Sequence, residues 1–291
     1  MSKTVKRSII NKYFTKDIYF EIYKITMIND LDNIDKGYLI IDYLKSTGLD
    51  FSPLGSGTNR MAILLDGYAV KIALDKDGMI DNRREMLYTK DLQPYVIKVY
   101  ECTPTGLIAV TEYVSAFTNK ADLLATHVVE AKKILSEISQ SYLVGDVGIT
   151  EKNYGNWGTR KTDGSLCILD YAYIYSVKYT LFSCTNEDCE NPNSLLQYDN
   201  NFVNLICPSC GTKYSFAMLR QRITRKQQEM EIGDIKRLGY NITKDNEEVD
   251  IIPEFEPKDE SKKKEVSEEK KEKEEIKKLI EEYHCGKFKN N

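Results

Sequence analysis

Four cysteines, arranged in two closely spaced pairs, constrain this chain more than any other feature. Cys184 and Cys189 are separated by four residues, Cys207 and Cys210 are separated by two, and seventeen residues lie between the pairs. Four thiolates at this spacing can close a tetrahedron around one Zn²⁺ ion. The chain has seven cysteines in all, and an odd number favours metal binding over a set of disulfides.

The segment around these cysteines has the pattern of a zinc ribbon, in which each pair sits on a tight turn at one end of a small β-sheet. The second pair supports this interpretation, because Pro208 presets a turn and Gly211 suits a backbone with positive φ. Four sulfur ligands saturate a tetrahedral ion and leave no position open for a substrate. We therefore expect residues 178–216 to form a ribbon that holds structural Zn²⁺.

Composition excludes several classes of protein. With 291 residues, of which 41% are hydrophobic and 30% charged, the chain can bury one large core or two modest ones and is not wholly disordered. The longest apolar runs, such as Tyr38 to Ile41, fall far short of the roughly 18 to 20 residues that a membrane helix needs. The basic residues at the N-terminus are not followed by an apolar stretch, so we expect no secretory signal, no membrane partner and a cytoplasmic location.

Charge is unevenly distributed along the chain. The segment from Lys244 to Asn291 carries 12 lysines and 16 acidic residues, so that 29 of the 41 basic and 29 of the 45 acidic residues precede it. A neutral folded part argues against a dominant phosphate-binding surface. Lys258 to Lys278 is almost continuous Lys, Glu, Asp and Ser, with too little apolar surface to offset the entropy of ordering. We expect a charged, disordered tail.

Hydrophobic periodicity divides the rest of the chain. Ile18, Ile22 and Ile25 recur at helical spacing, whereas short apolar runs separated by turn pairs such as Asp66-Gly67 and Asp77-Gly78 predict an antiparallel sheet. A helix interrupts this sheet at about residues 81–91. The expected parts are a helical lead-in (1–50), a sheet region (51–114), a mainly helical region (115–177) with one helix over 121–143 and a strand over 166–169, the ribbon (178–216), a helix (217–240) and the tail (241–291).

The sheet region contains several features that suit phosphate binding. Gly55 and Gly57 lie where a strand turns back, and bare backbone at such a turn can approach a phosphate. Lys71 lies inside the apolar strand Ala69-Val70-Lys71-Ile72, and a buried ammonium needs an anionic partner. Glu85, on the helix that interrupts the sheet, is the candidate partner.

The sheet region ends at Glu112, Tyr113 and Val114, where free main-chain groups can bond a flat base. The order of glycine turn, lysine strand, glutamate helix and linker resembles the small lobe of protein kinase-like folds. This resemblance implies that Lys71 grips the α- and β-phosphates of ATP and that Glu85 holds Lys71. It also implies that main-chain groups from Glu112 to Val114 receive the adenine.

The match continues beyond residue 115. Asn156, in Asn156-Trp157-Gly158, is followed fourteen residues later by Asp170 in Leu169-Asp170-Tyr171-Ala172. This pair is similar to the metal-binding asparagine and the Asp-Phe-Gly aspartate of kinases. Carboxylate and amide oxygens suit a hard cation, so the resemblance implies that Asn156 and Asp170 hold Mg²⁺.

The chain also departs from the kinase pattern. No His-Arg-Asp precedes Asn156, and the candidates for the catalytic base are Glu151, five residues before it, and Asp146, ten residues before it. Tyr171 and Ala172 replace the phenylalanine and glycine of Asp-Phe-Gly, and no Ala-Pro-Glu follows. The peptide-docking platform of ordinary protein kinases is therefore missing or replaced.

Residues 51–176 look like the divergent kinase-like proteins encoded by large phages of low-GC bacteria, a source whose location would be the bacterial host cytoplasm. The implied fold is α+β and two-lobed, with an antiparallel sheet in the small lobe, a reduced and mainly helical large lobe, and the four-cysteine zinc ribbon after them. The implied function is binding of ATP and Mg²⁺, with transfer of the γ-phosphoryl to an unknown protein or small-molecule acceptor.

Three other interpretations stay open. A catalytically dead pseudokinase scaffold accounts for the altered loop and the missing activation segment. In a plain α+β domain with a structural ribbon, Lys71 and Asp170 are ordinary solvent-reaching residues. In the third interpretation the ribbon is a module that binds nucleic acid or a polymerase through Tyr214, Phe216 and the basic residues of the next helix, namely Arg220, Arg222, Arg225 and Lys226.

Overall fold

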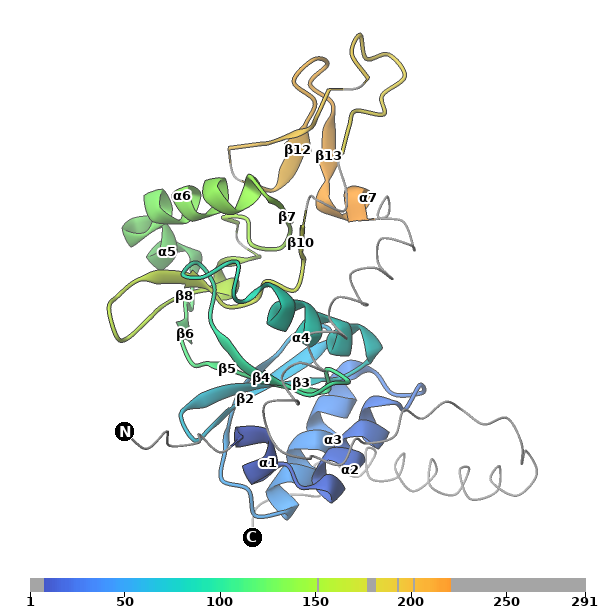
Figure 1. The fold of residues 1–291 in the computed structure, drawn as a ribbon, viewed down its shortest axis with the longest axis vertical. Helices are drawn as coiled ribbons and strands as arrows, with labels where there is room; N and C mark the ends of the chain where they lie inside the picture. The colour runs from blue at the N-terminus through green and yellow to red at the C-terminus, as the bar shows by residue number, and fades with distance from the viewer. Residues whose placement is uncertain (1–7, 151, 177–181, 193, 201, 221–291) are drawn as a thin grey trace, which may run out of the picture. The chain divides into compact units, whose positions relative to one another are not determined.

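The computed structural model describes residues 8–150, 152–176, 182–192, 194–200 and 202–220 (Figure 1). All of them belong to one compact unit, Met1–Asp245. The expected charged tail, and the expected helix beyond residue 220, lie outside the described residues. Among the described residues, no helix combines the length and the apolar character needed to cross a membrane.

Three helices precede the first strand, namely α1 (Ile9–Tyr13), α2 (Lys16–Thr26) and α3 (Asn33–Ser46). Helix α2 was expected from the periodicity of Ile18, Ile22 and Ile25, and both longer helices have a side-chain cap at the N-terminus. Thr15 accepts from the amide of Ile18 at 3.4 Å, and Asp32 accepts from that of Asp35 at 2.9 Å. The short helix α1 was not predicted, because a single turn has no measurable period.

The sheet region forms five antiparallel strands: β1 (Ser52–Ser56), β2 (Arg60–Leu65), β3 (Tyr68–Ala73), β4 (Val99–Cys102) and β5 (Ile108–Glu112). Their order is β1-β2-β3-β5-β4. One face of the sheet packs on α2 and α3, through a core that includes Ile22, Ile40 and Ile72. Because side chains alternate along a strand, Lys71 points to the other face, where helix α4 lies (Figure 1).

Helix α4 spans Lys76–Tyr88, so it begins and ends before the expected range of 81–91. The Asp77-Gly78 pair, expected as a turn, lies in its first turn. Asp75 caps the helix by accepting the amide of Gly78 at 2.7 Å. A Cβ on Gly78 would lie 2.1 Å from the carbonyl oxygen of Asn59, so glycine here allows close packing rather than chain reversal.

The region after β5 is not mainly helical, and that expectation is wrong. Its described residues form two helices and five short strands. The predicted helix over 121–143 is divided at His127 into two helices. Its last residues form a strand from Tyr142 instead, because pairing with a strand about thirty residues later overrides the helical periodicity. The elements are β6 (Ser115–Ala116), α5 (Lys120–Thr126), α6 (Val128–Ser139), β7 (Tyr142–Val144), the 3-10 turn η1 (Tyr154–Asn156), β8 (Trp157–Thr159), β9 (Leu166–Ile168) and β10 (Ile174–Ser176).

These short strands form two small antiparallel sheets. The first has the order β6-β8-β9, and the second pairs β7 with β10. A core that includes Leu135, Trp157 and Ile168 joins α6, β8 and β9, and it extends to α4 and β4 of the preceding region through Tyr88 and Val99.

The cysteine segment contains a three-stranded antiparallel sheet, β11 (Gln197–Tyr198), β12 (Asn204–Ile206) and β13 (Lys213–Ser215), in the order β11-β12-β13. Helix α7 (Phe216–Arg220) follows directly. Strands β11 and β12 lie between the two cysteine pairs, and β13 follows the second pair. The chain as described is an α+β fold built from antiparallel sheets.

Candidate functional site

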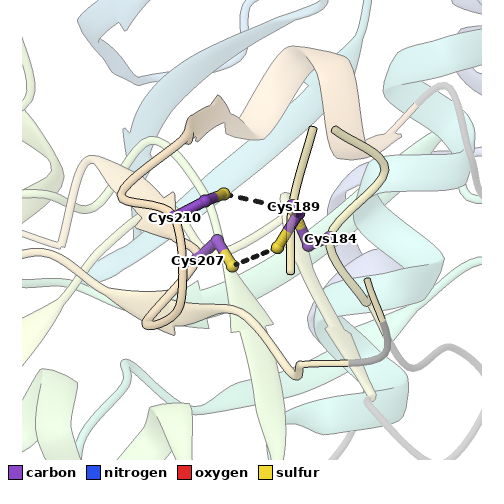
Figure 2. A group of neighbouring side chains, drawn as sticks. All are labelled: Cys184, Cys189, Cys207 and Cys210. Atoms are coloured by element: carbon purple, nitrogen blue, oxygen red, sulfur yellow. Dashed lines mark hydrogen bonds between the residues drawn. The ribbon is translucent and has the colours of Figure 1, made fainter. Parts of the chain in front are cut away.

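The four predicted cysteines come together. Their sulfur atoms all lie within 4.8 Å of one another, and Figure 2 shows the two pairs facing each other. Sγ of Cys184 lies 3.7 Å from that of Cys210, and Sγ of Cys189 lies 3.7 Å from that of Cys207. Four sulfurs converging on one point are the donor set of a structural metal site, so this cluster can hold a metal ion such as Zn²⁺.

Local hydrogen bonds prepare two of these thiols for a metal. The hydroxyl of Tyr214 lies 3.2 Å from Sγ of Cys184, and this contact lowers the pKa of that thiol. The hydroxyl of Thr212 lies 3.1 Å from Sγ of Cys210 and lowers its pKa to about 6. Thiolates are the metal-binding form, so both contacts favour coordination. Burial instead raises the pKa of Cys189, within the cluster, and that of Cys102, outside it, to about 12.

A second group of polar side chains lies where the five-stranded sheet meets the segment after β9. Nζ of Lys71, on β3, lies 2.8 and 2.7 Å from the two carboxylate oxygens of Glu85, on α4. The predicted ion pair is therefore present, and the Glu85 side chain is fully buried. Nζ of Lys71 also donates to the carbonyl oxygen of Leu169 at 2.8 Å. This contact brings the lysine next to Asp170, although ninety-eight residues separate Lys71 from Leu169.

Arg60 completes this group, and sequence reasoning assigned it no role. Its guanidinium Nη2 lies 3.0 Å from Oε1 of Glu85 and 2.7 Å from Oδ1 of Asp170. Nη1 donates to Oδ1 of Asn82 at 3.2 Å, and the side chain is only 8% exposed. Arg60 starts strand β2 directly after the glycine turn, and no local sequence signal marked it, because its contact with Asp170 spans one hundred and ten residues. Two buried cations thus share one buried carboxylate.

The electrostatic state of Asp170 follows from these neighbours. Its partial loss of solvent would raise the pKa, but the charges of Arg60 and then Lys71 outweigh that effect, and the pKa is lowered to about 2. The amide of Ala172 donates to the same Oδ1 at 3.3 Å. Both contacts made by described residues use Oδ1, and 46% of the side chain is exposed. Asp170 is therefore an ionised carboxylate whose Oδ2 can accept a further ligand.

Strand pairing brings Asn156, Asp146 and Asp170 to one edge. In the β8–β9 hairpin Trp157 lies opposite Ile168, and the amide of Leu169 donates to the carbonyl oxygen of Asn156 at 2.7 Å. In the β7–β10 pair Val144, the last residue of β7, lies opposite Ile174, the first of β10. Antiparallel pairing places the residues after β7 and the residues before β10 at the same end. Asp146 lies two residues after Val144, and Asp170 lies four residues before Ile174.

The loop that carries Asp146 is tied directly to Asn156. Nδ2 of Asn156 donates to the carbonyl oxygen of Asp146 at 2.6 Å. Asp146 has a φ of 55°, an uncommon value for a residue other than glycine, and its side chain is exposed. The second candidate base, Glu151, lies outside the described residues, so its place relative to Asn156 stays a prediction.

The residues predicted to bind adenine lie at the end of β5. The amide of Glu112 is already used, since it donates to the carbonyl oxygen of Lys98 at 2.8 Å, and the Glu112 carboxylate accepts from Nε of Arg160 at 2.9 Å. Within the described part of the chain, no hydrogen bond engages the main chain of Tyr113 or Val114. Val114 therefore keeps main-chain groups for a base, whereas Glu112 offers at most its carbonyl.

The two predicted glycines lie where β1 turns into β2. Gly55 is in the exposed strand β1 and pairs with Ala62, whereas Gly57 lies in the turn. The amide of Gly57 donates to the carbonyl oxygen of Arg60 at 2.8 Å, so the turn is closed by its own backbone. Of the basic residues proposed for nucleic-acid binding, Arg222, Arg225 and Lys226 lie outside the described residues.

Neither a family model nor a curated protein matches this chain. The chemistry of the two clusters, four sulfurs in one and paired cations and carboxylates in the other, is therefore the basis for assigning a function.

Proposed function

We propose that this chain is a divergent kinase-like protein that binds ATP together with Mg²⁺. In this proposal the α1–α3 helices and the five-stranded sheet form a small lobe, and residues 115–176 form a reduced second lobe. The single observation that carries the proposal is the contact of Lys71 with both Glu85 and the carbonyl of Leu169. A lysine held in this way lies beside the only charged residue of the Leu169-Asp170-Tyr171-Ala172 segment.

Lys71 suits a polyphosphate ligand because its position is fixed before the ligand arrives. Burying an ammonium and a carboxylate is costly unless they are paired and hydrogen-bonded, so such a pair is weak evidence of a role in stability. Nζ of Lys71 makes three hydrogen bonds, to Glu85 and Leu169, that hold its charge at the edge occupied by Asp170. There it can neutralise the α- and β-phosphates of ATP.

Asn156 and Asp170 are the residues that would hold Mg²⁺. Asp170 offers an ionised, half-exposed carboxylate, and Asn156 lies on the neighbouring strand end with its Nδ2 already bonded to Asp146. Because Nδ2 is the donor of that bond, the amide oxygen of Asn156 is left to act as a ligand. The ion, when bound, supplies charge neutralisation for the triphosphate.

Transfer would use the exposed carboxylate of Asp146. It would accept the proton of an acceptor hydroxyl while the hydroxyl oxygen forms a bond to the γ-phosphorus. The bond from the γ-phosphorus to the β,γ-bridging oxygen breaks, and ADP leaves with that oxygen. Glu151 is the alternative base on sequence grounds. Lys71 would stabilise the charge on the departing ADP through its phosphates.

A nucleotide-binding scaffold without phosphoryl transfer is the second candidate. The ion pair between Arg60 and Asp170 favours it, because an internal cation already occupies one oxygen of the carboxylate that a catalytic Mg²⁺ needs. The absence of an Ala-Pro-Glu segment after Asp170 points the same way. The two candidates share the ligand and differ in whether the γ-phosphoryl moves.

Thermal unfolding with ATP and Mg²⁺ tests the shared claim. ATP present at about 100 times its Kd stabilises the wild type by roughly 2.7 kcal/mol, which raises Tm by several degrees. Lys71→Met should lose this shift. Lys36→Met is the matched control, since Lys36 is a buried lysine on α3 that donates to the carbonyl of Thr26, and it should keep the shift. A wild type that shows no shift at millimolar ATP contradicts the proposal.

An assay with ATP labelled in its γ-phosphoryl group separates the enzyme from the scaffold. It measures transfer of the label to water or to the protein itself. Transfer that is lost in Asp146→Asn, while the ATP-induced shift in Tm persists, supports the enzyme. A chain that binds ATP with the expected dependence on Lys71 but transfers nothing supports the scaffold.

A further inference from the structure

The ribbon shares a core with the strand pair that leads to Asp146. One hydrophobic cluster contains Cys184, Cys207 and Leu205 of the ribbon together with Leu143 of β7 and Tyr175 of β10. Leu143 lies three residues before Asp146, and Tyr175 lies opposite Leu143 in the strand pair. The ribbon therefore packs on the strands whose end carries the candidate base, and its cysteines are part of that packing.

Phe216, the first residue of α7, packs against the start of the Asp146 loop. A Cβ on Gly145 would lie 2.5 Å from Cζ of the Phe216 ring, so only glycine lets the ring approach this closely. The same ring contacts Tyr173 and Tyr175, with centroids 6.2 and 6.0 Å apart. Phe216 thus touches the residue before Asp146 and two residues of the segment that follows Asp170.

Tyr198, on strand β11 of the ribbon, holds the other side of the same turn. Its hydroxyl accepts from the amide of Val144 and donates to the carbonyl oxygen of Val144 at 3.3 Å. A main-chain unit bonded at both its amide and its carbonyl by one side chain has little freedom to rotate. The residue fixed in this way is two positions before Asp146.

We propose that the ribbon is a positioning element for the Asp146 loop, so that metal binding at the four cysteines sets the conformation of that loop. The metal closes the ribbon, the closed ribbon presents Phe216 and Tyr198, and these side chains hold Gly145 and Val144. The proposal relies on the proposed function only for the catalytic meaning of Asp146. The coupling between metal and loop does not depend on ATP.

Trp157 reports on this loop without any ligand. It is the only tryptophan among the 291 residues, it is 0% exposed, and its Nε1 donates to the carbonyl oxygen of Val147 at 3.1 Å. Val147 follows Asp146 directly. Movement of the loop removes this hydrogen bond and admits water, which shifts tryptophan emission to longer wavelength and increases quenching by acrylamide.

The first arm of the experiment removes the metal from the full-length wild-type protein with a zinc chelator. We expect emission of Trp157 to move to longer wavelength, acrylamide quenching to increase, and both changes to reverse when Zn²⁺ is returned. Circular dichroism recorded on the same samples shows whether the helices remain. Release of zinc with unchanged emission and quenching would overturn the proposal.

The second arm leaves the metal in place and changes the two contacts. Phe216→Leu and Tyr198→Phe should both increase quenching of Trp157 while zinc content stays at the wild-type level. Met218→Leu is the matched control for the first variant, because Met218 lies on the same helix and is 52% exposed, and it should behave as wild type. If removal of the metal unfolds the whole chain, the two variants alone test the proposed coupling. Folded Phe216→Leu and Tyr198→Phe proteins with wild-type quenching would then refute the coupling, whether or not the chain binds ATP.

Discussion

The guanidinium of Arg60 lies 2.7 Å from Oδ1 of Asp170 and also contacts Glu85, the partner of Lys71. One buried arginine therefore links the carboxylate proposed for Mg²⁺ to the ion pair proposed for the phosphates. Charge-assisted hydrogen bonds of this kind are short and roughly twice as strong as neutral ones. Any cation that binds Asp170 has to compete with Arg60 or share the carboxylate with it.

Replacing Arg60 should make Mg²⁺ binding tighter. A hydrogen bond to a charged group contributes about 1.5–3 kcal/mol, and 1.4 kcal/mol corresponds to a factor of ten in affinity. Because the Asp170 side chain is half exposed, we take the lower end of that range for Arg60→Gln. The Mg²⁺ concentration that gives half of the ATP-induced rise in Tm should fall about tenfold, as measured by thermal unfolding across a Mg²⁺ titration.

A titration of the same variant without nucleotide provides the control for general destabilisation. Arg60→Gln should lower the starting Tm at every Mg²⁺ concentration, whereas the tenfold change concerns only the midpoint of the Mg²⁺ dependence. An unchanged midpoint would mean that Arg60 does not compete with the cation, and a higher midpoint would mean that Arg60 assists it.

Lys71 and Glu85 should show strong energetic coupling. Lys71→Met leaves the fully buried carboxylate of Glu85 with Arg60 as its remaining cation, so we expect a loss of about 3 kcal/mol, the lower end of the 3–5 kcal/mol typical of a broken buried pair. Urea unfolding at neutral pH measures this loss. The double variant Lys71→Met with Glu85→Gln should cost less than the two single changes added together. Additive losses would show that the pair is not coupled.

The parts of the fold that were predicted correctly depend on local signals. The two cysteine pairs, the strand containing Lys71 and the helix bearing Glu85 each carry their pattern within one element. Where pairing between strands far apart in the sequence determines the structure, the local hydrophobic pattern predicted the wrong element. Residues 121–143 have helical spacing throughout, yet Tyr142 to Val144 form a strand because Ile174 to Ser176 pair with them. Hydrophobic periodicity predicts which residues are buried, but it does not predict which element of the fold they pack against.

The candidate site shows the same division. Lys71 and Glu85 could be matched because an ammonium in an apolar strand demands an anion. Arg60 could not be assigned, since its contact with Asp170 spans one hundred and ten residues and depends on how β2 lies beside the segment after β9. The link from Asn156 to the carbonyl of Asp146 was equally hidden. Such contacts follow from tertiary packing alone.

Asp170 should titrate well below an ordinary aspartate. Its pKa is lowered to about 2 in the folded chain, whereas an unperturbed aspartate has a pKa of about 3.9. A depressed folded pKa stabilises the fold above the unfolded value, and that contribution is lost as pH falls from about 4 through about 2. Carbon-13 NMR of the aspartate carboxyls, with Asp170→Asn to assign the signal, measures the midpoint directly. In Arg60→Gln the midpoint should rise toward about 3.9, and a midpoint near that ordinary value in the wild type would contradict the ion pair.

The cysteine cluster should bind one zinc ion per chain, and that ion should be structural. Elemental analysis of the purified protein measures the ratio, and Cys207→Ser should abolish stoichiometric binding because a tetrahedral site needs all four sulfurs. Cys102→Ser is the matched control, since Cys102 lies outside the cluster, and it should keep one zinc.

Metal binding contributes on the order of 10 kcal/mol to folding in zinc-finger peptides, so chelation should expose the ribbon to proteolysis. Cleavage should then begin within residues 182–215 and leave the five-stranded sheet intact, whereas an equal rate of cleavage with and without chelator would exclude a structural ion.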